Sequence, residues 1–251
     1  DLKYGISDSF TLDLTLVPDF GQTAFDEVRL NLGPFEQTFE ENRAFFTEGV
    51  ELFDKGEIFF SRRIGGPPSG SIEDLNPNET IIEAPSNVNI LNAVKVSGRT
   101  KKGLGVGFLN SITERTYATI RDSVTGSTQK ILIEPITNYN VFVLDQVFNG
   151  NSSVSIINTN VLRDGSDFRD ANVTAGVFSI ADKGNRFRTS GRAIVSNVNN
   201  GDGYKSGFQS EFDVFRTKGN FRYRVGHDFA NTTLDINDLG VNFRNNYNNF
   251  V

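Results

Sequence analysis

Apolar and polar residues alternate along most of the chain, the pattern of β-strands whose two faces meet different surroundings. In the clearest run, residues 9–17, one face is apolar and the other polar: Phe10, Leu12, Leu14 and Leu16 against Thr11, Asp13 and Thr15. Later alternating runs predict strands at 92–98, 104–112, 116–123, 129–134, 139–148, 152–162, 171–181, 186–197, 205–216 and 220–229. We therefore expect an all-β fold of antiparallel strands.

The connections between these runs indicate how the strands are joined. Asn149-Gly150, Lys183-Gly184 and Lys218-Gly219 have the composition of two-residue hairpin loops. Longer polar links lie between and after them, at 164–170, 199–204 and 230–240. Alternating tight and long connections are typical of an up-and-down transmembrane β-barrel, complete or incomplete. A soluble all-β sandwich or barrel is the alternative.

The hairpins also predict strand register. A two-residue loop at Lys218-Gly219 places Val214 opposite Tyr223 and Asp213 opposite Arg224, the last pair on the inner, polar face. A two-residue loop at Lys183-Gly184 places Phe187 and Thr189 opposite Ile180 and Phe178 and gives a basic inner face. Three apolar residues depart from this pattern by sharing the inner face: Val173, Val177 and Ile194.

Residues 18–87 break the alternation. Phe39, Phe46, Val50 and Phe53 have helical spacing within a charged stretch, which predicts a short amphipathic helix. Residues 67–87 are rich in Pro, Gly, Ser, Asn and Glu and are predicted to be a long solvated loop. We expect a first strand at 1–17, an irregular insertion in or under the lumen at 18–87, and antiparallel strands from 88 to 251.

Composition narrows the functional classes. The 251 residues carry a net charge of −6 without a basic run, which argues against nucleic acid as a partner. The chain has no Cys, which excludes thiol catalysis and zinc–thiolate sites. Mean hydropathy is −0.32, and no window approaches the roughly 18 apolar residues of a transmembrane helix. The start at Asp1, with no signal-peptide pattern, indicates a mature form or an internal fragment.

Two groups of charged residues are candidates for binding. The first lies in the insertion: Glu40, Glu41, Arg43, Glu48, Arg62 and Arg63. It is either a lumenal ion-binding or gating cluster or a set of ion pairs that holds the insertion in place. The second lies on later strands: Arg186, Arg188, Arg192, Arg222 and Arg224. It is either a basic lumenal patch for anionic solutes or sugars, or a solvated inner wall with local ion pairs.

Catalytic patterns are weak. His227 stands next to Asp228, but the chain has one His and no Gly-x-Ser-x-Gly nucleophile elbow. The acidic side chains are scattered over many strands, so no pair has the flanking arrangement of a glycosidase. The loops 164–167 and 200–203 lack a full calcium-ligand pattern. We predict a non-enzymatic protein with no metal site and no cofactor.

Several segments resemble a known family: Asp-Leu-Lys-Tyr-Gly at 1–5, Leu-Thr-Leu-Val-Pro-Asp-Phe-Gly-Gln at 14–22, Glu-Asn-Arg-Ala-Phe-Phe-Thr-Glu-Gly at 41–49 and Phe-Phe-Ser-Arg-Arg-Ile-Gly at 59–65. They are similar to large outer-membrane proteins of unknown function in Bacteroidota. In that family an N-terminal β-sandwich resembling a family 9 carbohydrate-binding module precedes a barrel domain. The resemblance extends over most of this chain and places it in the first part of the barrel.

The resemblance implies a location in the bacterial outer membrane. It implies as partners outer-membrane lipid, other outer-membrane or periplasmic proteins, and glycans. Three functional hypotheses follow. The chain belongs to a barrel that acts as a channel, transporter or surface scaffold, or it anchors a carbohydrate-binding or carbohydrate-processing cell-surface protein. The third hypothesis is a soluble all-β binding domain.

Overall fold

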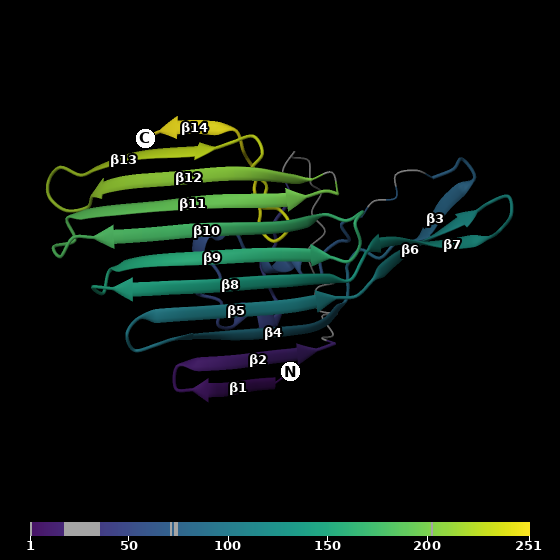
Figure 1. Ribbon diagram of the computed structural model, residues 1–251, viewed down its shortest axis with the longest axis horizontal. Helices are drawn as coiled ribbons and strands as arrows, with labels where there is room; N and C mark the ends of the chain where they lie inside the picture. Colours follow the sequence, from purple (N-terminus) through teal and green to yellow (C-terminus); the bar gives the residue numbers. More distant parts are fainter. Residues whose placement is uncertain (1, 18–35, 71, 73–74, 202) are drawn as a thin grey trace.

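The computed structural model describes residues 2–17, 36–70, 72, 75–201 and 203–251. Eleven antiparallel strands form one main sheet (Figure 1). In spatial order they are β1 (Leu2–Ser7), β2 (Phe10–Leu16), β4 (Ile90–Arg99), β5 (Leu104–Thr113), β8 (Thr137–Phe148), β9 (Ser152–Arg163), β10 (Asp170–Ala181), β11 (Phe187–Asn199), β12 (Tyr204–Arg216), β13 (Tyr223–Ala230) and β14 (Tyr247–Phe250). The all-β, antiparallel class is confirmed. Over the described residues the sheet is open, with β1 and β14 at its edges.

A separate three-stranded sheet projects beyond one end of the main sheet (Figure 1). It contains β3 (Glu79–Glu83), β6 (Thr116–Asp122) and β7 (Thr128–Glu134). The strands from 88 onward do not form one continuous up-and-down sheet, because β6 and β7 leave the main sheet and β5 pairs directly with β8. The prediction of a loop throughout 67–87 was also wrong, since Ile81 pairs with Ile120 and adds β3 to this sheet.

The main sheet exposes an outward face that carries many large apolar side chains, and it buries an inward face that mixes polar and apolar side chains. On β2, Asp13 and Thr15 are buried, whereas Leu16 is 66% exposed. On β8, Asp145 is buried and Phe142 is exposed, but Val141 and Val143 are also buried on the inward face. An alternation of this kind places apolar side chains outward and polar ones toward an interior.

The insertion lies against the inner face of the sheet. It contains one helical turn, α1 (Ala44–Thr47), and two 3₁₀ turns, η2 (Lys55–Glu57) and η3 (Ser61–Arg63). The predicted amphipathic helix is therefore reduced to α1, because Gly49 and Gly56 adopt positive φ and interrupt any continuation. Residues 18–35 of the predicted insertion lie outside the described residues. No described helix is long and apolar enough to cross a membrane.

A small apolar core joins the insertion to the sheet. Phe46, Phe53, Ile58 and Ile64 of the insertion pack with inward side chains that include Leu109, Val141, Val143, Ile157, Val161, Val173 and Ile194. Leu234, Ile236 and Leu239, from the connection between β13 and β14, complete the cluster. This contact explains why Val173 and Ile194 depart from the polar pattern of the inner face, since they cover the insertion.

The predicted hairpin registers were wrong because the loops are longer than two residues. At Lys183-Gly184, Ile180 pairs with Thr189, since Asp182 Oδ1 accepts backbone N–H groups of Arg186 and Phe187 and closes a wider loop. At Asn149-Gly150, Phe148 pairs with Ser152, which makes Asn151 part of the loop. The loop lengths thus follow local hydrogen bonds that the dipeptide rule does not include.

The Lys218-Gly219 hairpin has the same error, with Val214 opposite Val225 instead of Tyr223. The shift is by two residues, so every side chain keeps its face. Arg224 consequently still reaches Asp213, and its Nε donates to Asp213 Oδ1 at 2.6 Å. The predicted Asp213–Arg224 ion pair is confirmed, as a diagonal contact.

Hairpin loops and long connections occupy opposite ends of the main sheet (Figure 1). The hairpin end carries residues 8–9, 100–103, 149–151, 182–186 and 217–222. The opposite end, here called the long-loop end, carries the insertion, the three-stranded sheet, and residues 164–169, 200–203 and 231–246. The predicted alternation is confirmed in part, because the connection 217–222 is not tight.

Candidate functional site

Charged side chains on the inward face of the main sheet, here called the wall, bind the insertion to the sheet. Lys95 of β4 is fully buried, and its Nζ donates to the backbone carbonyl oxygens of Phe45 and Glu48. The Asp13 carboxylate of β2 lies 3.6 Å from the same Nζ. Lys95 therefore connects the wall to α1 through its own fully buried ammonium group.

Two more wall residues contact η2. The fully buried Asp145 of β8 accepts a hydrogen bond from Ser155 Oγ at 2.6 Å and pairs with Arg99 and with Lys55 of η2, whose Nζ is 3.8 Å away. Arg192 of β11 donates to the Gly56 carbonyl oxygen and pairs with Glu57. These contacts connect η2 to β8 and β11.

Arg43 bonds to several other residues of the insertion. Its guanidinium donates to both carboxylate oxygens of Glu41 and to the backbone carbonyl oxygens of Ser61 and Ile64. Burial raises the pKa of Glu41, but the hydrogen bonds and charge of Arg43 outweigh burial and hold this pKa below its ordinary value of 4.5. Arg43 and Glu41 thus form a buried ion pair that folds the insertion onto η3.

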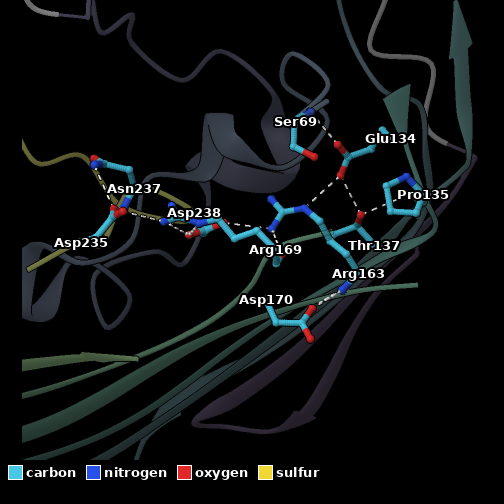
Figure 2. Close-up of polar contacts among 10 residues, drawn as sticks. All are labelled: Ser69, Glu134, Pro135, Thr137, Arg163, Arg169, Asp170, Asp235, Asn237 and Asp238. Atoms are coloured by element: carbon cyan, nitrogen blue, oxygen red, sulfur yellow. Dashed lines mark hydrogen bonds and ion pairs between the residues drawn. The ribbon is translucent and has the colours of Figure 1, made fainter. Parts of the chain in front are cut away.

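A cavity of about 610 Å³ opens at the long-loop end of the interior. One side is lined by the insertion, including Phe39, Arg62 and Arg63, and the other by Glu134, Tyr139, Arg163, Arg169, Asp235, Asn237 and Asp238. Figure 2 shows that the charged side chains on this second side form one network. The volume of the cavity lies within the range of small-ligand pockets.

The network, here called the loop clasp, consists of Glu134, Arg163, Arg169, Asp235 and Asp238. Arg163 pairs with Glu134 at 3.3 Å and with Asp238 at 2.9 Å. Arg169 contacts Asp238 and Asp235, and although its burial lowers its pKa, the hydrogen bonds and charge of Asp238 raise that pKa above its ordinary value. The loop clasp joins β7, β9, the 164–169 loop and the 231–246 connection (Figure 2).

The charged groups of the loop clasp pair with one another and so join separate segments of the chain. Each carboxylate of the loop clasp accepts from or pairs with a guanidinium. Among the described residues, no group of three or more His, Asp or Glu side chains is arranged to hold a metal. His227 and Asp228 are neighbours on β13 and therefore point to opposite faces of the sheet, and His227 Nε2 contacts Asn248 Oδ1.

The predicted charged residues do not converge on one site. Arg62 and Arg63 line the cavity, where Arg62 donates to the Glu40 carbonyl oxygen and Arg63 makes two hydrogen bonds to Glu36. Glu48 pairs with Lys3 at the surface. The remaining arginines lie elsewhere: Arg192 against the insertion, Arg188 at Ser179, Arg224 at Asp213, Arg186 near Asp182, and Arg222 exposed in the 217–222 connection. The role of these residues in binding stays a prediction.

Lys95, Asp145 and the loop clasp were not singled out from the sequence. Lys95 and Asp145 occupy inward positions of alternating strands. The alternation in the sequence could therefore have shown that both charges face the interior. Their partners, however, are distant in the chain: the Phe45 carbonyl oxygen is 50 residues from Lys95. The loop clasp likewise joins Arg169 to Asp238 across 69 residues.

Fold and site together define an all-β domain in which an inserted segment packs on the inward face of an antiparallel sheet. The chain belongs to a family described as a domain of unknown function (DUF5916), whose family model matches residues 1–251. The resemblance to a family of unknown function is confirmed at that level. No curated protein and no solved structure matches the chain.

Proposed function

We propose that the main sheet forms part of the wall of a bacterial outer-membrane β-barrel, with its apolar face toward lipid. We further propose that the insertion fills the interior, so that the protein acts as a non-enzymatic surface scaffold or anchor and not as an open channel. The observation that carries this proposal is an oblique belt of exposed apolar side chains on the outward face.

The belt consists of large side chains that no part of the described structure covers. Its exposed members on the main sheet include Leu16, Leu104, Phe108, Phe142, Val154, Ile156, Ile180, Phe187, Val195, Phe208, Phe212, Tyr223 and Val225. Exposed apolar patches of monomeric proteins in water seldom exceed a few hundred Å². An apolar face that extends over most strands of a sheet therefore needs a non-aqueous neighbour.

The course of the belt across the strands favours lipid as that neighbour. Pairing defines one row of directly opposed outward residues, here called the reference row: Leu14, Val94, Asn110, Asn140, Asn160, Asn172, Asn197 and Ser206. On β2 the apolar side chains include Leu14 of this row and Leu16 beyond it. On β12 they begin one outward position toward the hairpin end, at Phe208, and continue to Val214.

The belt thus reaches farther toward the long-loop end on β2 than on β12. Strands of a membrane barrel are tilted by roughly 35–45° from the membrane normal, so residues at one depth shift along successive strands. A flat hydrocarbon layer crossing tilted strands produces this displacement. An apolar face that covers a second sheet in a soluble sandwich has no reason to follow such a line.

The filled interior favours a scaffold over a channel. The core cluster and the wall contacts of Lys95, Asp145 and Arg192 occupy the inner face along α1 and η2. Buried charges that are paired in this way resist displacement, because separating them leaves unpaired charges in a poorly solvated place. An anchor for a carbohydrate-handling cell-surface protein is compatible with the same geometry.

Replacing Phe142 by Arg tests the lipid-facing assignment. Phe142 of β8 and Tyr117 of β6 are each 42% exposed, but only Phe142 lies in the belt. Phe142→Arg is expected to reduce the free energy of folding into lipid bilayers by about 1–2 kcal/mol, because Phe142 is the outward residue next to Asn140 of the reference row and lies at the long-loop border of the belt, between the midplane, where an arginine costs about 2–4 kcal/mol, and the interface, where it costs about 1 kcal/mol or less. Tyr117→Arg, on the three-stranded sheet, is expected to change it by about 0.5 kcal/mol or less.

The measurement is urea titration of folding into large unilamellar vesicles, followed by tryptic protection. Equal small effects of the two variants would contradict the proposal. That result would favour the alternative of a soluble all-β binding domain.

A further inference from the structure

Asparagines interrupt the apolar outward face in a regular way. Five members of the reference row are Asn, on the neighbouring strands β5, β8, β9, β10 and β11: Asn110, Asn140, Asn160, Asn172 and Asn197. Three further polar residues stand one outward position away on the same strands: Asn138, Asn158 and Thr174. These eight residues, here called the amide band, are all half-buried.

Side chains of the amide band bond to one another. Asn110 Nδ2 donates to Asn138 Oδ1 at 2.7 Å and to Asn140 Oδ1 at 2.9 Å. Asn158 Nδ2 donates to Thr174 Oγ1 at 2.8 Å and to Asn172 Oδ1 at 3.1 Å. Asn110 Nδ2 and Asn158 Nδ2 also contact the backbone carbonyl oxygens of Tyr139 and Val173. Each amide oxygen can accept two hydrogen bonds, so the bonds within the band use only part of the capacity of its side chains.

The amide band borders the belt on its long-loop side. Along β8, Asn140 is followed toward the hairpin end by the outward Phe142 and Leu144, and along β9, Asn158 is followed by Ile156 and Val154. On the other side of the band the outward positions are mixed, with Ile112 and Leu162 beside Asn138. The band therefore separates the apolar belt from a mixed part of the outward surface.

We infer that the amide band is a binding surface for lipid headgroups, lying at the level where the sheet leaves the hydrocarbon layer. This inference rests on the proposed function. Polar groups in hydrocarbon are unfavourable unless paired, and the amide band is only partly paired within itself. Headgroup phosphate and hydroxyl oxygens accept hydrogen bonds from amide N–H groups, and headgroup hydroxyls donate to amide oxygens. Neighbouring strands are about 4.8 Å apart; Asn138 on β8 extends the band toward the long-loop end, and Asn158 and Thr174 on β9 and β10 extend it toward the hairpin end, so the band shifts along the strands in the same direction as the belt.

Depth measurement with nitroxide labels tests this placement, and the absence of Cys makes single-cysteine variants clean reporters. Labels are attached at Asn140→Cys and Leu144→Cys on β8, and at Asn158→Cys and Val154→Cys on β9, in phosphatidylcholine vesicles. Collision rates with oxygen and with a water-soluble nickel complex give the depth. The two belt labels are expected to lie about 10 Å deeper than their partners in the amide band, since each pair is separated by four residues on a tilted strand.

The outcomes separate this inference from the proposed function. If amide-band and belt labels lie at equal depth within the hydrocarbon, the inference is overturned and the proposed function stands. If both kinds of label are open to water, both are overturned. Shielding of the amide-band labels from both reagents, with spin–spin broadening between molecules, would instead assign the amide band to a contact between two copies of the chain and would also overturn the inference.

Discussion

The Lys95→Met variant is expected to lose about 3–5 kcal/mol of unfolding free energy, the cost of removing one partner from a buried charge pair. Methionine keeps the length of the side chain but has no donor for the Phe45 and Glu48 carbonyl oxygens, and it leaves Asp13 without its nearest cation. The lost contacts join β2 and β4 to the insertion. The insertion should therefore loosen from the sheet before the sheet itself unfolds.

Urea unfolding in detergent micelles measures the loss, and the rate of tryptic cleavage after Lys55 measures the release of η2. Lys130→Met is the matched control, because Lys130 is exposed on β7 of the three-stranded sheet. The control is expected to change stability by about 0.5 kcal/mol or less. If both variants unfold like the wild type and Lys55 stays protected, the insertion is not held by Lys95.

The Gly56→Ala variant is expected to lose about 2–4 kcal/mol, from overpacking and from a backbone conformation that alanine adopts poorly. Gly56 has φ +74°, and a Cβ atom there would lie 2.9 Å from Ala175 Cβ and 3.0 Å from Ile157 Cγ2. Both contacts belong to side chains of the sheet wall. The new methyl group must push η2 away from β9 and β10.

Gly150→Ala separates the two causes. Gly150 has φ +72°, close to that of Gly56, but a Cβ atom there meets nothing within 4 Å. Its expected loss is about 1 kcal/mol, the backbone contribution alone. Equal losses in the two variants, measured by urea unfolding, would show that η2 does not pack against the wall as closely as the structure indicates.

Strands were predictable from the sequence because alternation is a local property. The run at 9–17 and the later runs correspond to β2 and to β4–β13, whereas β1 was not separated from β2. Register was less predictable, since the loop around Lys183-Gly184 is widened by bonds to Asp182 that a dipeptide rule does not contain. The length of the predicted helix was wrong because Gly49 and Gly56 end it.

The interior contacts depend on residues far apart in the chain. Ile194 faces inward although the alternation predicts a polar residue there. Its position is explained by the insertion, which packs on this part of the sheet. Lys95 pairs mainly with backbone carbonyl oxygens. Every residue has such an oxygen, so the sequence does not show which residues are the partners of Lys95. The loop clasp needs Arg163, Arg169 and Asp238 to be brought together by two separate connections. Alternation therefore predicted which face each side chain occupies, but not which partner it meets.

Flotation of the wild-type protein with lipid vesicles tests most directly whether the outward face contacts hydrocarbon. After folding into vesicles, the protein is washed with alkaline carbonate and centrifuged through a density gradient. We expect it to float with the lipid and to need detergent for extraction, because large apolar side chains such as Phe108, Phe142 and Phe212 are 40%, 42% and 48% exposed on the outward face. Release by the wash as a monodisperse species that is stable in plain buffer would contradict a membrane-embedded sheet.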